Sequence, residues 1–169
     1  DQSVDGYNSL FSTVEVAPTL QINDHFYIDG VAVWEATQDP EPNDDNFLDN
    51  EGLYVEEIKL NFENGPYAAW AGKFNPGFGV AGDAASRIWG VDFAEAYEIA
   101  EKLGFGGGYT FESAQFGSHT VAANTFFADT SFLSGSTVTN RGRTDKDDGG
   151  ASNSEDFSSY VFSLGGENL

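Results

Sequence analysis

The sequence contains no cysteine, only seven lysine and arginine residues, and no long apolar run. Without cysteine, the chain has no disulfide framework, no thiolate metal site and no cysteine nucleophile. The seven basic residues stand against 28 acidic ones, for a formal charge of −21. We therefore expect no nucleic-acid partner, because phosphate binding needs a surface rich in lysine and arginine. No stretch approaches the ~18 apolar residues of a membrane helix, which excludes a helical span.

Aromatic residues, by contrast, are abundant and make up 15% of the chain. Disordered acidic segments are poor in aromatics, so this chain is expected to fold. Its length predicts a single domain over residues 1–169. The chain opens on Asp1 and shows no signal peptide, so we expect it to be processed, trimmed or only partly recorded.

The dominant pattern is an alternation of period two, which puts alternate side chains on opposite faces of a β-strand. From Leu10 to Ile22, one set includes Val14 and Val16, and the other includes Thr13 and Glu15. This stretch exceeds the ~5–6 residues of an average strand and is close to the ~9–11 that cross a bilayer at a tilt. Seven strands are predicted in this way: Leu10–Ile22, a strand from Phe26 through Trp34, Leu53–Glu63, Tyr67–Asn75, a strand ending at Phe111, His119–Phe127 and Phe157–Leu164.

Four details of these strands can be checked directly. In the third strand, Tyr54 is predicted to share an apolar face with Ile58, Leu60 and Phe62, a face that Glu56 interrupts. In the fourth, Trp70 and Phe74 are placed on the lipid-facing side. The alternation extends the fifth strand back through Tyr97, in preference to a helix over Asp92–Lys102. A turn is expected at Gly165–Asn168.

Short and long connections alternate between the strands. The short turns are at Asn23–Asp24, Glu63–Pro66 and Ser113–Gly117, and the long loops span Thr37–Gly52, Pro76–Tyr97 and Ala128–Asp156. The first long loop, with its two prolines, is expected to lack regular structure. Short turns on one side and long loops on the other are typical of outer-membrane barrels. The sequence thus predicts an all-β fold, an antiparallel transmembrane β-barrel. Because the first and seventh strands would both run downward, we expect an internal piece of a larger barrel that lacks strands at both ends.

Two stretches carry a family resemblance: GKFNPGFG at Gly72–Gly79 and RIWGVDFAEAYEIAEKLGFGGGYTF at Arg87–Phe111. With Asn23–Val33 and Thr125–Ser134, they make the chain similar to porin-like outer-membrane proteins of Gram-negative bacteria. The resemblance implies a channel for passive diffusion of small polar solutes or ions, surrounded by outer-membrane lipid. It implies no catalytic residue and no cofactor. Family members are expected to end in an aromatic residue, so the ending Asn168-Leu169 again suggests C-terminal truncation. A homotrimer, as in many porins, is left open.

If the aromatic-rich face meets lipid, the opposite face lines a lumen. The predicted pore-lining residues are Glu15, Asp29, Glu35, Glu57, Lys59, Lys73 and Lys102. The three lysines fall on three consecutive strands and acids dominate the two before, which predicts a transverse field across the pore. The alternative is that these side chains are simply hydrated interior residues that balance one another.

Other chemistry finds little support in the sequence. The loop Asp39–Glu51 lacks the glycine of an EF-hand, and Asp145–Asp156 lacks a fifth-position oxygen ligand and flanking helices, so both are taken as solvated loops rather than calcium sites. The run Gly104–Gly108 lacks the Lys-Ser/Thr of a phosphate loop. Its glycines are expected to permit close packing or the passage of a neighbouring aromatic. No HExxH motif occurs, and we predict no metal site and no enzyme activity.

A second hypothesis is a soluble, exported, acidic β-sandwich that binds carbohydrate or calcium. Alternation with one buried face suits a sandwich as well. Strand length, aromatics near strand ends and the regular alternation of short and long connections favour the barrel.

Overall fold

The structure is a computed structural model that describes residues 7–42, 44–77, 99–115, 117–142 and 153–167. Its strands are β1 (Ser9–Leu10), β2 (Val14–Val16), β3 (Thr19–Gln21), β4 (Phe26–Ala36), β5 (Asn46–Phe47), β6 (Glu51–Asn64), β7 (Tyr67–Phe74), β8 (Lys102–Ser113), β9 (Gly117–Ala128), β10 (Thr137–Val138) and β11 (Ser159–Glu167). One 3₁₀ turn, η1 (Phe132–Ser134), completes the elements. None of the described residues belongs to a helix long and apolar enough to cross a membrane.

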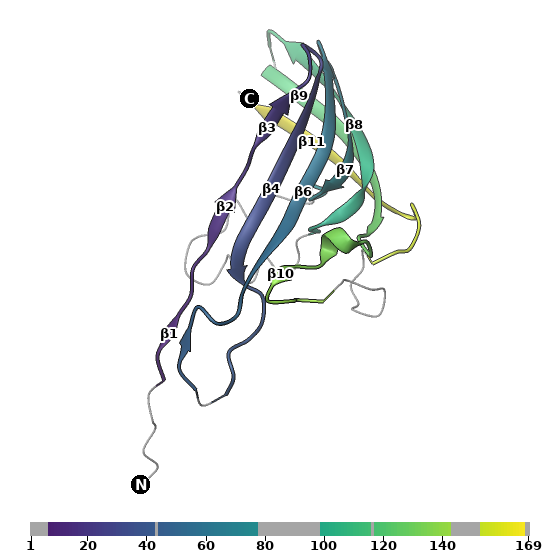
Figure 1. The fold of residues 1–169 in the computed structure, drawn as a ribbon. Helices are drawn as coiled ribbons and strands as arrows, with labels where there is room; N and C mark the ends of the chain where they lie inside the picture. The colour runs from purple at the N-terminus through teal and green to yellow at the C-terminus, as the bar shows by residue number, and fades with distance from the viewer. Residues whose placement is uncertain (1–6, 43, 78–98, 116, 143–152, 168–169) are drawn as a thin grey trace.

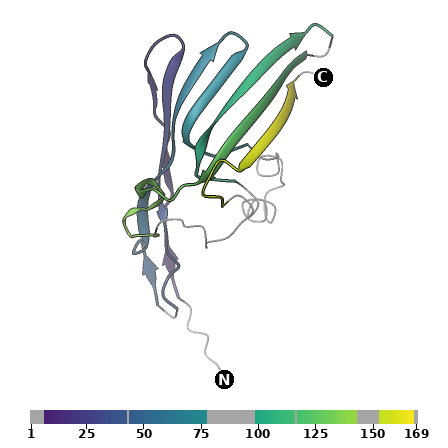
Figure 2. The same ribbon diagram turned by 90° about the vertical axis from the view of Figure 1, so that its right-hand side faces the viewer.

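The long strands form one antiparallel sheet in which spatial order follows chain order. β2 and β3 pair with β4, followed by β6, β7, β8, β9 and β11. Short hairpins join β3 to β4, β6 to β7 and β8 to β9 at one end of the sheet, and the connection from β4 to β6 lies at the other end (Figure 2). The predicted all-β antiparallel class is confirmed. The described sheet is not a closed barrel, because β2–β3 and β11 form its two edges without pairing with each other (Figure 1).

The first predicted strand is divided into three short pieces. Pro18, which has no backbone N–H, separates β2 from β3, and its carbonyl accepts a hydrogen bond of 2.9 Å from the Gly30 N–H. β1 leaves the main sheet and pairs in parallel with β5. The expectation that the Thr37–Gly52 loop lacks regular structure is therefore wrong at Asn46–Phe47.

Cross-strand pairing defines two faces of the sheet. We call one the outer face; it carries Leu60 of β6, Phe105 of β8 and Phe162 of β11, whose side chains are largely exposed. We call the other the inner face; it carries Asn61 of β6 and Phe126 of β9, which are buried. The sheet is curled, so β11 passes behind β4 and β6 in the view of Figure 1.

A β-bulge in β6 explains why Glu56 interrupts the apolar pattern. Val31 pairs with Glu57, but the next residue, Ala32, pairs with Val55, so Glu56 is an extra residue with no partner on β4. The bulge reverses the parity of the strand. The prediction that Tyr54 shares the face of Leu60 is therefore wrong: Tyr54 pairs with Val33 on the inner face and is buried.

The placement of Trp70 and Phe74 on the lipid-facing side is also wrong. Trp70 pairs with Asn61 of β6 and Gly106 of β8, both on the inner face, and Phe74 is buried. The other side of β7 carries Tyr67, Ala69 and Ala71, which are exposed. Apolar residues thus occupy both faces of this strand, and no polar contrast distinguishes them.

Two strand boundaries differ from the predictions. β8 begins at Lys102, and Ile99–Glu101 is not extended strand; Glu101 has a positive φ of 53°. Tyr97 lies outside the described residues, as does most of the Asp92–Lys102 segment, for which a helix is the less favoured alternative. The predicted turn at Gly165–Asn168 is wrong, because Gly165 and Gly166 continue β11 and pair with Thr120 and His119 of β9.

Candidate functional site: the polar inner face

The inner face of β3, β4 and β6 carries a chain of hydrogen-bonded polar side chains. Asp29 stands between Thr19 and Lys59 in the sheet register. Its carboxylate accepts from the Thr19 hydroxyl at 2.7 Å and from the Asn61 amide at 3.0 Å. The Lys59 ammonium lies 2.9 Å from the Glu57 carboxylate two residues away. Polar groups that face into a curled sheet are thus satisfied by one another, as buried polar groups usually are.

The side chain of Trp70 lies across the neighbouring strand, β8, at Gly106, which has no side chain to block it. A Cβ added at Gly106 would stand 2.6 Å from Trp70 Nε1 and 2.2 Å from Asn124 Oδ1, so only glycine fits there. The indole N–H reaches over Gly106 and donates a 2.8 Å hydrogen bond to Asn124 of β9. The expectation that the glycine run lets a neighbouring aromatic pass is confirmed at Gly106.

Lys73 is the centre of an ion-pair network near the loop end of the sheet. It follows Gly72, whose φ of 143° departs from normal strand geometry. The Lys73 side chain is 0% exposed, and its ammonium contacts Glu101 at 2.8 Å and Asp129 at 3.2 Å. It also donates to the carbonyl of Leu133 in η1 at 2.8 Å. Two of these partners, Asp129 and Leu133, belong to the β9–β11 connection, so the buried ammonium links this connection to β7.

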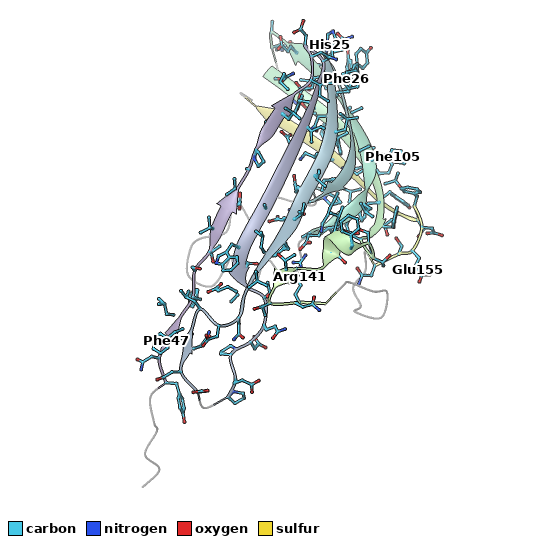
Figure 3. The ribbon with its side chains drawn as sticks, in the orientation of Figure 1. His25, Phe26, Phe47, Phe105, Arg141 and Glu155 are labelled. Carbon is cyan, nitrogen blue, oxygen red and sulfur yellow. The ribbon has the colours of Figure 1, made fainter. Side chains whose placement is uncertain are left out.

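Arg141 extends the network to β6. Its guanidinium forms a two-pronged ion pair with Glu101 and donates to the Ser134 carbonyl. The guanidinium carbon lies 3.7 Å from the centre of the Tyr54 ring, a cation–π contact. The Tyr54 hydroxyl in turn donates to Glu35 at 2.5 Å. Figure 3 shows Arg141 at the loop end of the sheet and His25 and Phe26 at the opposite, short-turn end.

The residues predicted to line a pore have the following places. Glu15, Asp29, Glu35, Glu57, Lys59 and Lys102 lie at inner-face positions of the register, and Lys73 is enclosed in the network just described. Lys59, Lys73 and Lys102 do lie on three consecutive strands, β6 to β8. Their role in a pore stays a prediction. They do not form a separate basic wall, because Glu57 pairs with Lys59 and two acids contact Lys73.

Several residues of this face were missed from the sequence. Trp70 was assigned to the wrong side, and the amide side chains Asn61 and Asn124 drew no attention. Arg141 is 40 residues from Glu101 and comes from a loop without periodicity. The sequence held one indication of where the indole lies: the glycines of β8 leave room beside Trp70 of β7.

Metal chemistry finds no ligand set in the described part of the chain, where no three His, Asp or Glu side chains gather into a site that could hold a metal ion. Most of the Asp145–Asp156 stretch lies outside that part. In the described residues the inner face offers hydrogen-bond donors and acceptors and the partly exposed indole ring of Trp70.

Comparison of the chain with protein-family models, with curated proteins and with solved structures found no match.

Proposed function

We propose that this chain forms part of the wall of a β-barrel channel in the outer membrane of Gram-negative bacteria, through which small polar solutes or ions diffuse. The observation that carries the proposal is the inverted polarity of the sheet. Its outer face is apolar and exposed, and its inner face carries the hydrogen-bonded polar side chains, some of which are buried. A soluble antiparallel sheet normally does the reverse and packs its apolar face on a core.

The outer face is apolar from one edge of the sheet to the other. Its exposed large hydrophobic residues are Val14, Val16, Leu20, Phe26, Leu53, Ile58, Leu60, Tyr67, Phe105, Tyr109, Phe111, Val121, Tyr160, Phe162 and Leu164. The largest exposed apolar patch on a typical soluble monomer is only about 300–600 Å². A surface that extends over eight strands, β2–β4, β6–β9 and β11, is better suited to hydrocarbon than to water.

Strand length supports the same environment. β4 has 11 residues, β6 has 14, and β8 and β9 have 12 each. A tilted strand needs about 9–11 residues to cross the hydrocarbon core. In a membrane the two edges of this sheet would pair with further strands, because each unsatisfied backbone group in lipid costs several kcal/mol.

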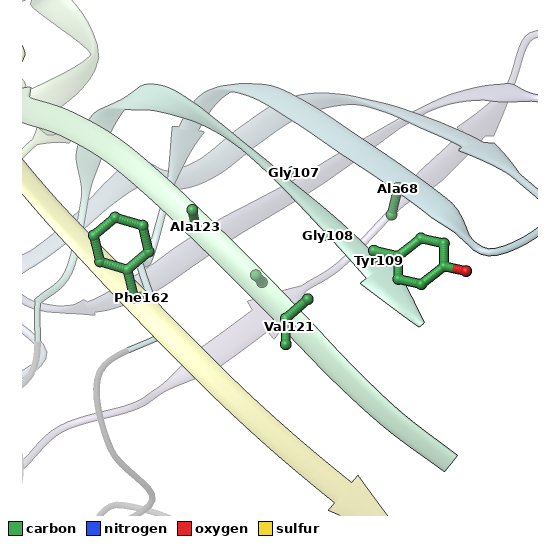
Figure 4. Close-up of a pocket in the computed structure, with 8 residues that line it drawn as sticks. Ala68, Gly107, Gly108, Tyr109, Val121, Ala123 and Phe162 are labelled. Carbon is green, nitrogen blue, oxygen red and sulfur yellow. The ribbon is translucent and has the colours of Figure 1, made fainter. Parts of the chain in front are cut away.

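The soluble sandwich is the weaker candidate. It requires a second sheet on the apolar face, and within the described residues the only other sheet is the two-stranded pair of β1 and β5. The outer face also contains a hollow of about 470 Å³ between Phe162, Val121 and Tyr109, over the small residues Gly107 and Ala123 (Figure 4). An apolar hollow of this kind is a place for a lipid acyl chain.

The test uses the natural absence of cysteine, since each introduced cysteine is unique. Leu60→Cys and Lys59→Cys lie next to each other in β6 on opposite faces. Each is labelled with a nitroxide after the chain is reconstituted in lipid vesicles. We expect oxygen, which concentrates in hydrocarbon, to relax the label at position 60, and a water-soluble nickel complex to relax the label at position 59. A label at position 60 that responds only to the nickel complex would contradict the proposal.

A further inference from the structure

A cleft of about 330 Å³ opens on the inner face between β6, β7, β9 and β11. Its principal lining residues are Lys59, Asn61, Trp70, Phe74, Asn124 and Ser163. This volume is near the lower end of the ~300–1,000 Å³ range of small-molecule sites. The cleft therefore suits a ligand of one or two small rings.

The indole of Trp70 has a fixed position in this cleft. Gly106 supports one side of the ring, and the hydrogen bond to Asn124 fixes its direction across β8. Since the glycine backbone covers one side, the opposite side is the one that the cleft can offer to a ligand. A rigid aromatic side chain loses little conformational freedom when a ligand packs on it.

The groups around the ring are mostly neutral and polar. Asn124 accepts from Trp70 through its oxygen, which leaves the two N–H donors of its amide for a ligand. Ser163 adds a hydroxyl, which can donate or accept. Among the described residues that line the cleft, Lys59 is the one with a charge, and the Glu57 carboxylate neutralises it at 2.9 Å.

We infer that this cleft binds a neutral saccharide. The C–H face of one sugar ring packs on the exposed side of Trp70, and ring hydroxyls exchange hydrogen bonds with Asn124 and Ser163. An anionic solute fits less well, because Lys59, the charged residue among the described lining residues, is already paired with Glu57. The inference rests on the proposed function for its role, a solute site along the pore, but saccharide binding itself needs no conducting pore.

The experiment measures binding of radiolabelled maltose to the full chain in detergent micelles by equilibrium dialysis. Trp70→Leu removes the ring, and Trp34→Leu is its matched control, since Trp34 belongs to the outer face. Gly106→Ala keeps the Trp70 ring but displaces it, because the added Cβ would occupy the ring's place. Its control is Gly108→Ala on the same strand and face, where a Cβ has nothing closer than 3.4 Å. Far-UV circular dichroism verifies that each variant keeps its β-structure.

We expect saturable maltose binding that weakens about tenfold in Trp70→Leu and in Gly106→Ala, given the usual value of an aromatic contact. The Trp34→Leu and Gly108→Ala variants should bind like the parent chain. Absence of saturable binding by the parent, or equal weakening by Trp34→Leu and Trp70→Leu, would overturn the inference. The nitroxide result at positions 59 and 60 is independent of maltose, so failure of the saccharide site and failure of the membrane proposal can be distinguished.

Discussion

Replacing Lys73 with methionine removes the charge at the centre of the buried network while keeping the side-chain length. In the parent chain the ammonium contacts Glu101, Asp129 and the Leu133 carbonyl and is fully shielded from solvent. The variant leaves the Asp129 carboxylate, which is 1% exposed, without its counter-ion. Removing one member of a buried ion pair typically lowers the free energy of unfolding by about 3–5 kcal/mol.

The matched control is Lys59→Met on the adjacent strand. Its partner Glu57 is also a carboxylate at 2.9 Å, but here the side chains are 25% and 15% exposed. Water screens such a pair, and the expected loss is about 1 kcal/mol or less. The two variants thus make the same chemical change at sites that differ in burial and in the number of partners.

The assay is equilibrium urea unfolding in detergent micelles, followed by tryptophan fluorescence. Adding Asp129→Asn to Lys73→Met should recover part of the lost stability, because no unpaired charge is then buried. The reasoning would be refuted if Lys73→Met and Lys59→Met were equally stable, or if Asp129→Asn lowered the stability of the Lys73→Met variant further.

Two more predictions concern the bulge and the charge. Deleting Glu56, the extra residue of the bulge, should leave both faces of β6 intact and cost about 1 kcal/mol for its lost hydrogen bond from Asn75. Deleting Lys59, which has a partner on β4, should instead shift one half of β6 by a residue and prevent stable folding. Urea unfolding measures the stability of both deletion variants. Equal stability of the two would contradict the assigned bulge. The complete channel should prefer cations over anions at low salt because of the charge of −21. The preference should fade as the Debye length falls to about 3 Å at 1 M salt. Reversal potentials in planar bilayers measure it, and an anion preference would show that basic groups determine the selectivity.

The sequence was sufficient for the strands whose two faces differ in polarity. In β8, glycines alternate with Leu103, Phe105 and Tyr109, and the predicted faces agree with the structure. In β7, alanine and aromatic residues occupy both faces, so period two alone could not say which side Trp70 takes. A bulge is similarly invisible, because one additional residue such as Glu56 looks like a polar interruption until the partner strand is known.

The ion-pair network was beyond the sequence for a different reason. Arg141 and Asp129 come from an irregular connection. Arg141 pairs with Glu101, 40 residues away, and Asp129 pairs with Lys73, from which β8 and β9 separate it in the chain. The contacts of a loop depend on its position in the folded structure, and the local periodicity of the sequence does not predict that position. Gly106 carried a usable signal, since an unsubstituted position opposite a tryptophan indicates where a ring can lie.

The sequential order of the strands has a consequence for how this sheet assembles. Each long strand pairs with its neighbour in the chain, so hairpins can form locally and join one after another. β10 makes the pairing most distant in the chain: Thr137 bonds to Leu53 over 84 residues, and beside it Thr37 bonds to Thr139 over 102. These long-range bonds can form only after β7, β8 and β9 have brought the two segments together. We therefore expect them to be the last part of the sheet to form and the first to open.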